Sequence, residues 1–125
     1  MYIGLADPEE RDEWNKFVVK HSDSEFLQSW GWGEFQKSYG RRVWRFIVRQ
    51  DEKIYAVGMA VCSELVRGRH YVYVPRAPIF NQELSRDRKR VIWSLFTQQW
   101  RLIGLESNSI FIRIVVKYFF IIFFK

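Results

Sequence analysis

FLQSWGWGEFQK, residues 26–37, is the stretch that decides the fold, because two tryptophans and two glycines crowd into a few positions. It predicts a short helix entered through Gln28 and Ser29, with the Ser29 hydroxyl as N-cap. The helix should end at Gly40, because glycine readily adopts the left-handed backbone of a C-terminal cap. Apolar residues that recur at helical spacing predict its buried face: Trp32, Phe35 and Tyr39.

The composition indicates one folded domain. The chain has 125 residues, and 18% of them are aromatic, which argues against disorder. A formal net charge of +6 favours polyanionic partners such as tRNA, nucleotide phosphates or an anionic membrane face, although the cations read as scattered. The single cysteine, Cys62, excludes an internal disulfide and suits a reducing cytoplasm. Early acidic residues break any signal-peptide pattern, so we expect a cytoplasmic protein.

Local patterns on both sides of this stretch predict the other elements. A helix should run from Asp7 to about Lys20, because Asp7 and Pro8 form an N-cap and a first helical position. Strands are predicted over residues 43–49, 54–64, 70–74 and 109–116, and a helix over 87–102 that ends at Gly104. The core side of that helix is predicted to hold Val91, Ile92, Leu95, Phe96 and Trp100.

These elements give an α/β fold of the layered α+β kind. Three strands form an antiparallel meander, helices pack on it, and a further strand lies near the C-terminus. On the second strand, small residues share one face: Ala56, Gly58 and Ala60. On the third strand, we expect one of Tyr71 and Tyr73 to face the core and the other to line a groove.

The last nine residues, 117–125, break the pattern, because they show neither strand alternation nor helical polarity. Arg113 and Lys117 interrupt the apolar run, and the remaining apolar segment is far shorter than the roughly 20 residues of a membrane-spanning helix. A buried final strand is one interpretation, since such strands can be apolar on both faces. The preferred hypothesis is that residues 1–116 form an incomplete domain and that residues 117–125 are a hydrophobic tail not native to it.

Four motifs then occur in an order that resembles a known family. They are residues 26–37, residues 40–45 (GRRVWR), residues 71–79 (YVYVPRAPI) and residues 111–114 (FIRI). This order resembles the FemABX family of peptidoglycan-bridge aminoacyltransferases, over Met1 to about Ile114. The resemblance implies a partial GNAT-like (acetyltransferase-like) domain, the first of two such halves.

The resemblance also implies an activity and partners. Members of that family transfer an amino acid from aminoacyl-tRNA to the stem-peptide amine of lipid II or of UDP-MurNAc-pentapeptide. No cofactor and no metal are expected, and peripheral association with the inner membrane face is compatible with such an acceptor. We expect a truncated relative of these enzymes, with little or no activity alone.

Five residues are substrate-binding candidates through the resemblance. Gln36 or Lys37 matches the helix segment where the family places a phosphate-contacting lysine. Arg76 lies between two prolines directly after a strand, where a rigid loop can aim its guanidinium at a phosphate. Tyr73 and Arg113 belong to the third and fourth motifs. Each also has a structural interpretation: a solvated lysine, a locally paired arginine or a packed tyrosine.

The catalytic residues stay unknown from sequence. The family usually has an acidic residue and then a proline after the fourth motif, where this chain has Val115 and Val116. A carboxylate there could orient or deprotonate the acceptor amine, so its absence argues against catalysis. His21 and His70 are isolated and predict no metal site. Two other functions stay open: a basic RNA-binding or scaffold module, and a small-molecule N-acyltransferase.

Overall fold

The structure is a computed structural model, and it describes residues 1–22, 26–116 and 120–124. The described chain forms a seven-stranded mixed sheet in the order β1-β2-β3-β4-β6-β7, with β5 paired to β3 off this path. The strands are β1 (Tyr2–Leu5), β2 (Arg42–Gln50), β3 (Lys53–Glu64), β4 (His70–Pro75), β5 (Ile79–Phe80), β6 (Ser109–Val115) and β7 (Phe120–Phe124). The helices are α1 (Arg11–His21), α2 (Trp30–Ser38) and α3 (Arg86–Glu106), with 3₁₀ turns η1 (Pro8–Glu10) and η2 (Phe26–Gln28).

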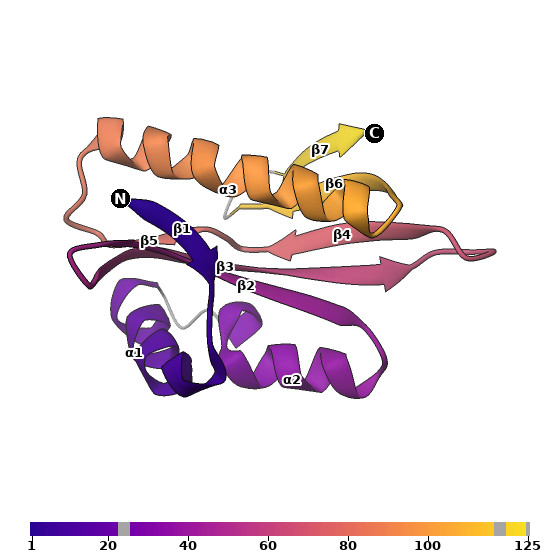
Figure 1. The fold of residues 1–125 in the computed structure, drawn as a ribbon, viewed down its shortest axis with the longest axis horizontal. Helices are drawn as coiled ribbons and strands as arrows, with labels where there is room; N and C mark the ends of the chain where they lie inside the picture. The colour runs from indigo at the N-terminus through magenta and orange to yellow at the C-terminus, as the bar shows by residue number, and fades with distance from the viewer. Residues whose placement is uncertain (23–25, 117–119, 125) are drawn as a thin grey trace.

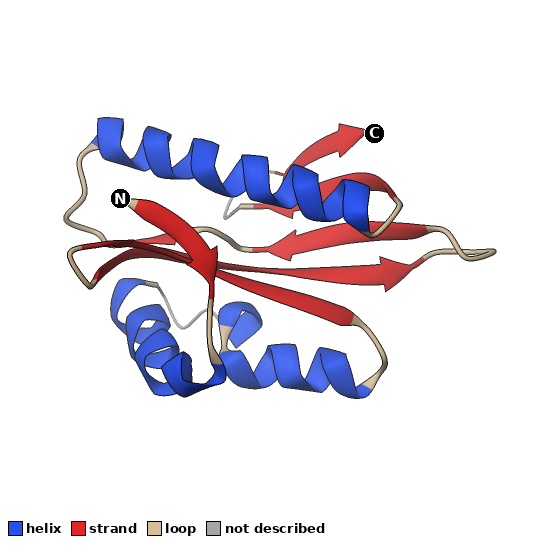
Figure 2. Cartoon of the chain, viewed as in Figure 1, coloured by secondary structure: helices blue, strands red, loops and turns tan. Residues whose placement is uncertain are grey.

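The domain has three layers. Helix α3 lies on one face of the sheet, and α1 and α2 lie on the other (Figure 1). β4 and β6 run parallel, while the neighbouring pairs β1–β2, β2–β3, β3–β4 and β6–β7 are antiparallel. The long α3 makes the crossover between the parallel strands, as Figure 2 shows by secondary structure. The layered α+β prediction is therefore correct.

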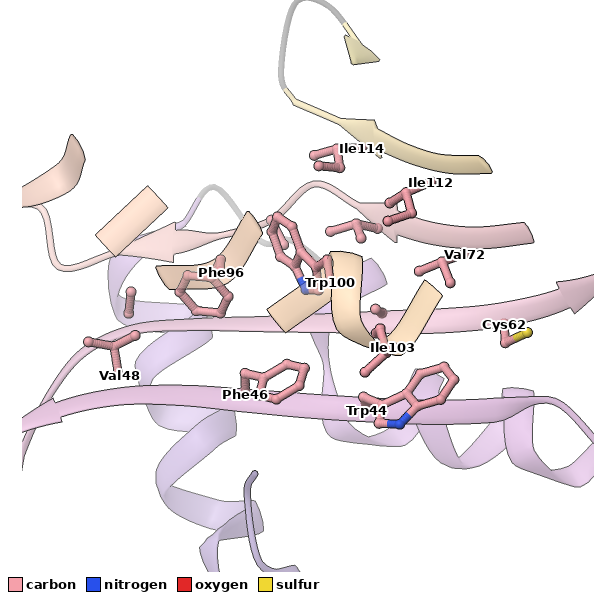
Figure 3. Close-up of a cluster of buried hydrophobic side chains, with 14 of the residues drawn as sticks. Trp44, Phe46, Val48, Cys62, Val72, Phe96, Trp100, Ile103, Ile112 and Ile114 are labelled. Carbon is pink, nitrogen blue, oxygen red and sulfur yellow. The ribbon is translucent and has the colours of Figure 1, made fainter. Parts of the chain in front are cut away.

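The core between α3 and the sheet is built from large rings over small strand residues. Phe96 and Trp100 of α3 are fully buried and lie over the strands (Figure 3). A Cβ atom built at Gly58 would lie 2.8 Å from Phe96 Cε1, so the α3 rings need a glycine beneath them. The small face predicted for β3 is confirmed: Ala56 and Ala60 belong to the same buried cluster.

Two predictions about α3 are wrong. Val91 is exposed, because it lies one position away from the buried stripe through Ile92, Phe96 and Trp100. Gly104 does not end the helix. It is buried within α3, where a Cβ atom would lie 3.1 Å from the Cδ1 of Ile112. The glycine therefore serves close packing of α3 on β6, and the helix ends after Glu106 instead.

The predicted buried face of α2 is also wrong. Ser29 is the N-cap, since its hydroxyl accepts a hydrogen bond from the Trp32 N–H, and Gly40 has φ +80° as predicted. However, Phe35 and Tyr39 are exposed and Trp32 is half-buried. The face turned to the sheet instead consists of Trp30, Gly33 and Gln36. Helical spacing predicted this helix, but the buried Arg45 side chain of β2 determines which face of the helix packs on the sheet.

Two outer strands extend the sheet beyond the predicted elements. β1 pairs antiparallel with β2, and β7 pairs antiparallel with β6. Ile122 lies opposite Arg113 in this register. The backbone of residues 120–124 is thus paired as a strand, as in the interpretation of a final strand. Residues 117–119 and 125 of the proposed tail lie outside the described residues, and its origin stays a hypothesis.

Candidate functional site

Gln28 fills a gap between strands at the centre of the sheet. β3 pairs with β5 up to Val57 and with β4 from Val61 onward, so the backbone of Met59 lies between the two pairings. The fully buried Gln28 accepts a hydrogen bond from the Met59 N–H (2.8 Å), and its Nε2 donates to the carbonyls of Met59 and Pro75. The amide thus replaces missing strand contacts and fixes where β4 ends.

The WGWGE segment of α2 encloses a buried arginine. Arg45 on β2 donates from Nη2 to the Trp30 carbonyl (2.8 Å) and to Glu34 Oε2 (3.0 Å). Its guanidinium carbon lies 3.8 Å from the centroid of the Trp30 ring. A Cβ atom at Gly33 would lie only 2.4 Å from Arg45 Nη2. The glycine therefore makes space for the charge, while Trp30 and Glu34 accept hydrogen bonds from its Nη2.

Burial is the main cause of the pKa shift of Arg45, whereas the hydrogen bond between the two residues is the main cause of the pKa shift of Glu34. Burial lowers the pKa of Arg45, and the hydrogen bond and charge of Glu34 offset this only in part. The Glu34 carboxyl is half-exposed and loses less hydration than the Arg45 guanidinium. The hydrogen bond from Arg45 therefore lowers its pKa. The pair thus places a charged guanidinium under α2 at a desolvation cost, with the carboxylate at the surface end.

Lys37 and Gln36 follow on the same helix but point into different surroundings. Gln36 is buried, and its Oε1 accepts a hydrogen bond from Arg41 Nη1 at 2.7 Å. Lys37 is exposed, with its Nζ 3.5 Å from Glu34 Oε2. Gln36 is neutral and buried, so of the two candidates Lys37 is the one that offers an accessible positive charge. Because Glu34 contacts both Lys37 and Arg45, the buried arginine supports the position of this lysine.

Tyr73 and Arg113 are brought together from neighbouring strands. They are register partners of the parallel β4–β6 pair, and the Arg113 guanidinium lies 5.7 Å from the Tyr73 ring centroid. Two residues earlier on each strand, Tyr71 stacks on Phe111, with ring centroids 5.1 Å apart. The expectation that Tyr71 and Tyr73 face opposite ways is wrong. Residues two apart on a strand share a face, and here Val72 takes the core side.

Arg76 opens the loop after β4 beside a hollow. Its backbone is left-handed (φ 56°), and its N–H donates to the Val115 carbonyl at 2.7 Å. The hollow has a volume of about 380 Å³ and lies between the end of α1, the β4–β5 loop and α3. Its walls are His21, Ser22, Arg76, Ala77, Pro78, Ile79, Phe80, Gln82, Lys89 and Val116. Among the residues that the structure describes, these walls include two cations and no carboxylate, which suits an anionic ligand.

His21 connects α1 to the far wall of this hollow. Its Nδ1 accepts a hydrogen bond from the Gln82 N–H at 3.2 Å, which requires an unprotonated Nδ1. Burial lowers the pKa of His21, and the positive charges of Lys20 and Lys53 lower it further, against the opposing effect of Glu83. The imidazole is therefore held in its neutral form as a structural acceptor.

The site residues that sequence reasoning missed are basic. Lys89, Arg86 and Arg90 gather at the start of α3 next to the hollow, within a run of four cations and one carboxylate at residues 86–90. The interpretation that cations are scattered overlooked this run. By contrast, the structure places Lys37 on α2 above β2 and β3, on a different part of the sheet from the β4–β6 candidates.

Two negative findings concern metals and membranes. The described residues contain no group of three His, Cys, Asp or Glu side chains that could hold a metal ion. Among the helices of the described segments, none combines the length and hydropathy needed to cross a bilayer.

Comparison with known proteins places this arrangement in a family. The sequence model of the FemAB family matches residues 10–95, which is more than half of the chain. The chain belongs to the FemAB family. The matched residues contain three of the four motifs, namely 26–37, 40–45 and 71–79. A search of curated proteins finds no significant match.

Solved structures agree with the FemAB assignment at the level of the fold. A crystal structure of FemX superposes with a TM-score of 0.70 at 19% identity, covering 91% of this chain and 27% of that one. A probable acetyltransferase gives 0.65 at 13% identity, covering 94% of this chain and 80% of the other. The aminoglycoside 6'-N-acetyltransferase AAC(6')-IG from Acinetobacter haemolyticus gives 0.62 at 12% identity, covering 87% and 74%.

The expected partial GNAT-like fold is thereby confirmed, since two of these neighbours are acetyltransferases. This FemAB chain spans about a quarter of the length of the FemX chain. Val116 and Arg76 both stand in the wall of the hollow.

Proposed function

We propose that this chain is the precursor-binding part of a peptidoglycan-bridge aminoacyltransferase, and that it is nearly inactive by itself. The FemAB match over residues 10–95 supports the reaction class. The two cations in the wall of the hollow, Arg76 and Lys89, support binding of a phosphate-bearing substrate. The proposed acceptor is the stem-peptide amine of lipid II or UDP-MurNAc-pentapeptide, and the donor is aminoacyl-tRNA in the cytoplasm.

The proposed reaction moves an acyl group from an ester to an amine. The acceptor amine attacks the ester carbonyl carbon of aminoacyl-tRNA, so that a C–N bond forms and the ester C–O bond breaks. The ribose hydroxyl of the tRNA leaves with a proton that originates on the amine. Positioning of two large substrates supplies much of the rate in such a transfer. The role of this chain is to hold the phosphates of the acceptor, with Arg76 as the main contact.

A transfer assay tests this proposal. The 125-residue chain and a version extended by a second GNAT-like half are incubated with charged tRNA and either acceptor. We expect little turnover from the short chain and clear turnover from the extended one. Robust turnover by the 125 residues alone would refute the truncation, and no turnover by either protein would refute the function.

A matched pair of arginines tests the hollow. Arg76 and Arg67 both lie in loops with left-handed backbone, at φ 56° and 57°, and both are exposed. In the extended protein, Arg76→Gln should raise KM for the acceptor about tenfold, as expected for loss of one charge-assisted hydrogen bond. Arg67→Gln should leave KM unchanged. Equal effects of the two substitutions would exclude the hollow as the phosphate site.

A further inference from the structure

A second hollow adjoins the first along the start of α3. Its volume is about 490 Å³, and its walls are Phe80, Arg86, Lys89, Arg90, Trp93 and Ser94. Phe80 and Lys89 also line the first hollow, so the two cavities form one continuous surface. The second hollow, called here the α3 track, combines cations and aromatic rings.

The cations of the α3 track are available to a ligand. Arg86 and Arg90 are exposed and make no ion pair with any residue in the described part of the chain. Lys89 is half-buried, with its Nζ 5.9 Å from the centroid of the Phe80 ring. The acidic residues closest in sequence, Glu83 and Asp87, are not among the walls of either hollow. Within the described segments, the track therefore presents positive charge with no carboxylate in its walls.

The aromatic rings of the track are fixed by the fold. Trp93 packs edge-on against the fully buried Trp100, with ring centroids 6.2 Å apart and an interplanar angle of 85°. Phe80 lies on β5, where it pairs with Ala56 of β3. Both rings are half-buried, so each is held by the core and still reaches a hollow. Rigid rings beside cations are the arrangement on which bases of single-stranded nucleic acids stack.

We propose that the α3 track binds single-stranded RNA, with bases against Phe80 and Trp93 and phosphates at Arg86, Lys89 and Arg90. Cations and aromatic rings line the same hollow, which suits a ligand that offers phosphates and bases together. The inference rests on the proposed function and deepens it, because the acceptor end of a tRNA is single-stranded RNA, for which the track is the docking surface. Its test needs no catalytic turnover.

Fluorescence anisotropy of the 125-residue chain with a labelled six-nucleotide RNA tests the track. The double variant R86Q/R90Q should weaken binding at least tenfold at roughly 50 mM salt and reduce the slope of log K against log salt by about 1.4, or about 0.7 for each lost phosphate contact. Phe80→Leu should weaken binding about 5- to 100-fold by removing one stacking surface. Circular dichroism confirms that each variant is folded.

The matched control removes two exposed arginines at the tip of the β3–β4 hairpin. R67Q/R69Q makes the same change in net charge but should alter RNA affinity less than twofold. If both double variants weaken binding equally, the attraction is unspecific and the proposal fails. If R86Q/R90Q abolishes binding to phosphatidylglycerol vesicles while RNA affinity is unchanged, the track is a membrane contact and the proposal also fails.

The two proposals fail in distinguishable ways. RNA binding at the track without amino-acid transfer by the extended protein would refute the aminoacyltransferase function alone. Transfer by the extended protein that is unaffected by R86Q/R90Q, together with the absence of RNA binding, would refute the track alone.

Discussion

Gly33→Ala should be strongly destabilising, although the change replaces a helical glycine by the best helix former. The new methyl group would lie 2.4 Å from Arg45 Nη2 and 2.7 Å from Met59 Sδ. Both atoms belong to buried side chains, so neither can move into solvent without cost. The Arg45 guanidinium must shift away from the Trp30 carbonyl, the Glu34 carboxylate or both.

The expected cost is the balance of three effects. Helix propensity favours alanine over glycine by about 0.5–1 kcal/mol. Loss of one hydrogen bond to the buried guanidinium costs about 1.5–3 kcal/mol, and overpacking of the α2–sheet contact costs about 1–3 kcal/mol more. The net loss in the free energy of unfolding is about 2–5 kcal/mol, a large part of the stability of a small domain.

The same helix provides the control. A methyl group at Gly31 would have no heavy atom within 4 Å, so Gly31→Ala should stabilise the protein by about 0.5–1 kcal/mol. Urea denaturation followed by tryptophan fluorescence measures both changes. In an R45M background, the cost of Gly33→Ala should fall, because the nearer clash partner is gone, but not vanish, because Met59 Sδ remains 2.7 Å from the new methyl group. Equal stabilities of the two alanine variants would show that the enclosure of Arg45 does not require glycine.

Three further changes test other parts of the fold. Gln28→Leu leaves the Met59 backbone groups without their partner and should cost about 3 kcal/mol or more in urea denaturation; a cost below about 1 kcal/mol would contradict the gap-filling role. The pKa of His21 is lowered in the folded state, so its contribution to the free energy of unfolding is present above about pH 6.5 and is lost as the pH falls. His21→Gln should remove this dependence from the pH profile of the unfolding midpoint. Gly58→Ala should cost about 1–3 kcal/mol by pushing into the α3 rings, which thermal unfolding measures against wild type.

Some residues of the site can be predicted from sequence and others cannot. Tyr73 and Arg76 stand in motifs that the sequence displays, so the sequence alone makes them candidates. Lys89 is different, although the basic run at residues 86–90 could have indicated it. Its place beside Arg76 depends on the β4–β5 loop returning to the start of α3. No local pattern carries that information.

The sequence by itself determined the elements with local causes: the Ser29 cap, the left-handed Gly40, the alternating strands and the ordered motifs of the FemAB family. Only the tertiary structure decided which face of α2 is buried, because the deciding contact is with Arg45, 15 residues from Trp30. It likewise decided the role of Gln28, whose hydrogen bond to Pro75 spans 47 residues. Helical spacing indicates that a helix has an apolar side. Which side of α2 faces the sheet is determined by Arg45, because its buried guanidinium needs Gly33 and the Trp30 ring above it.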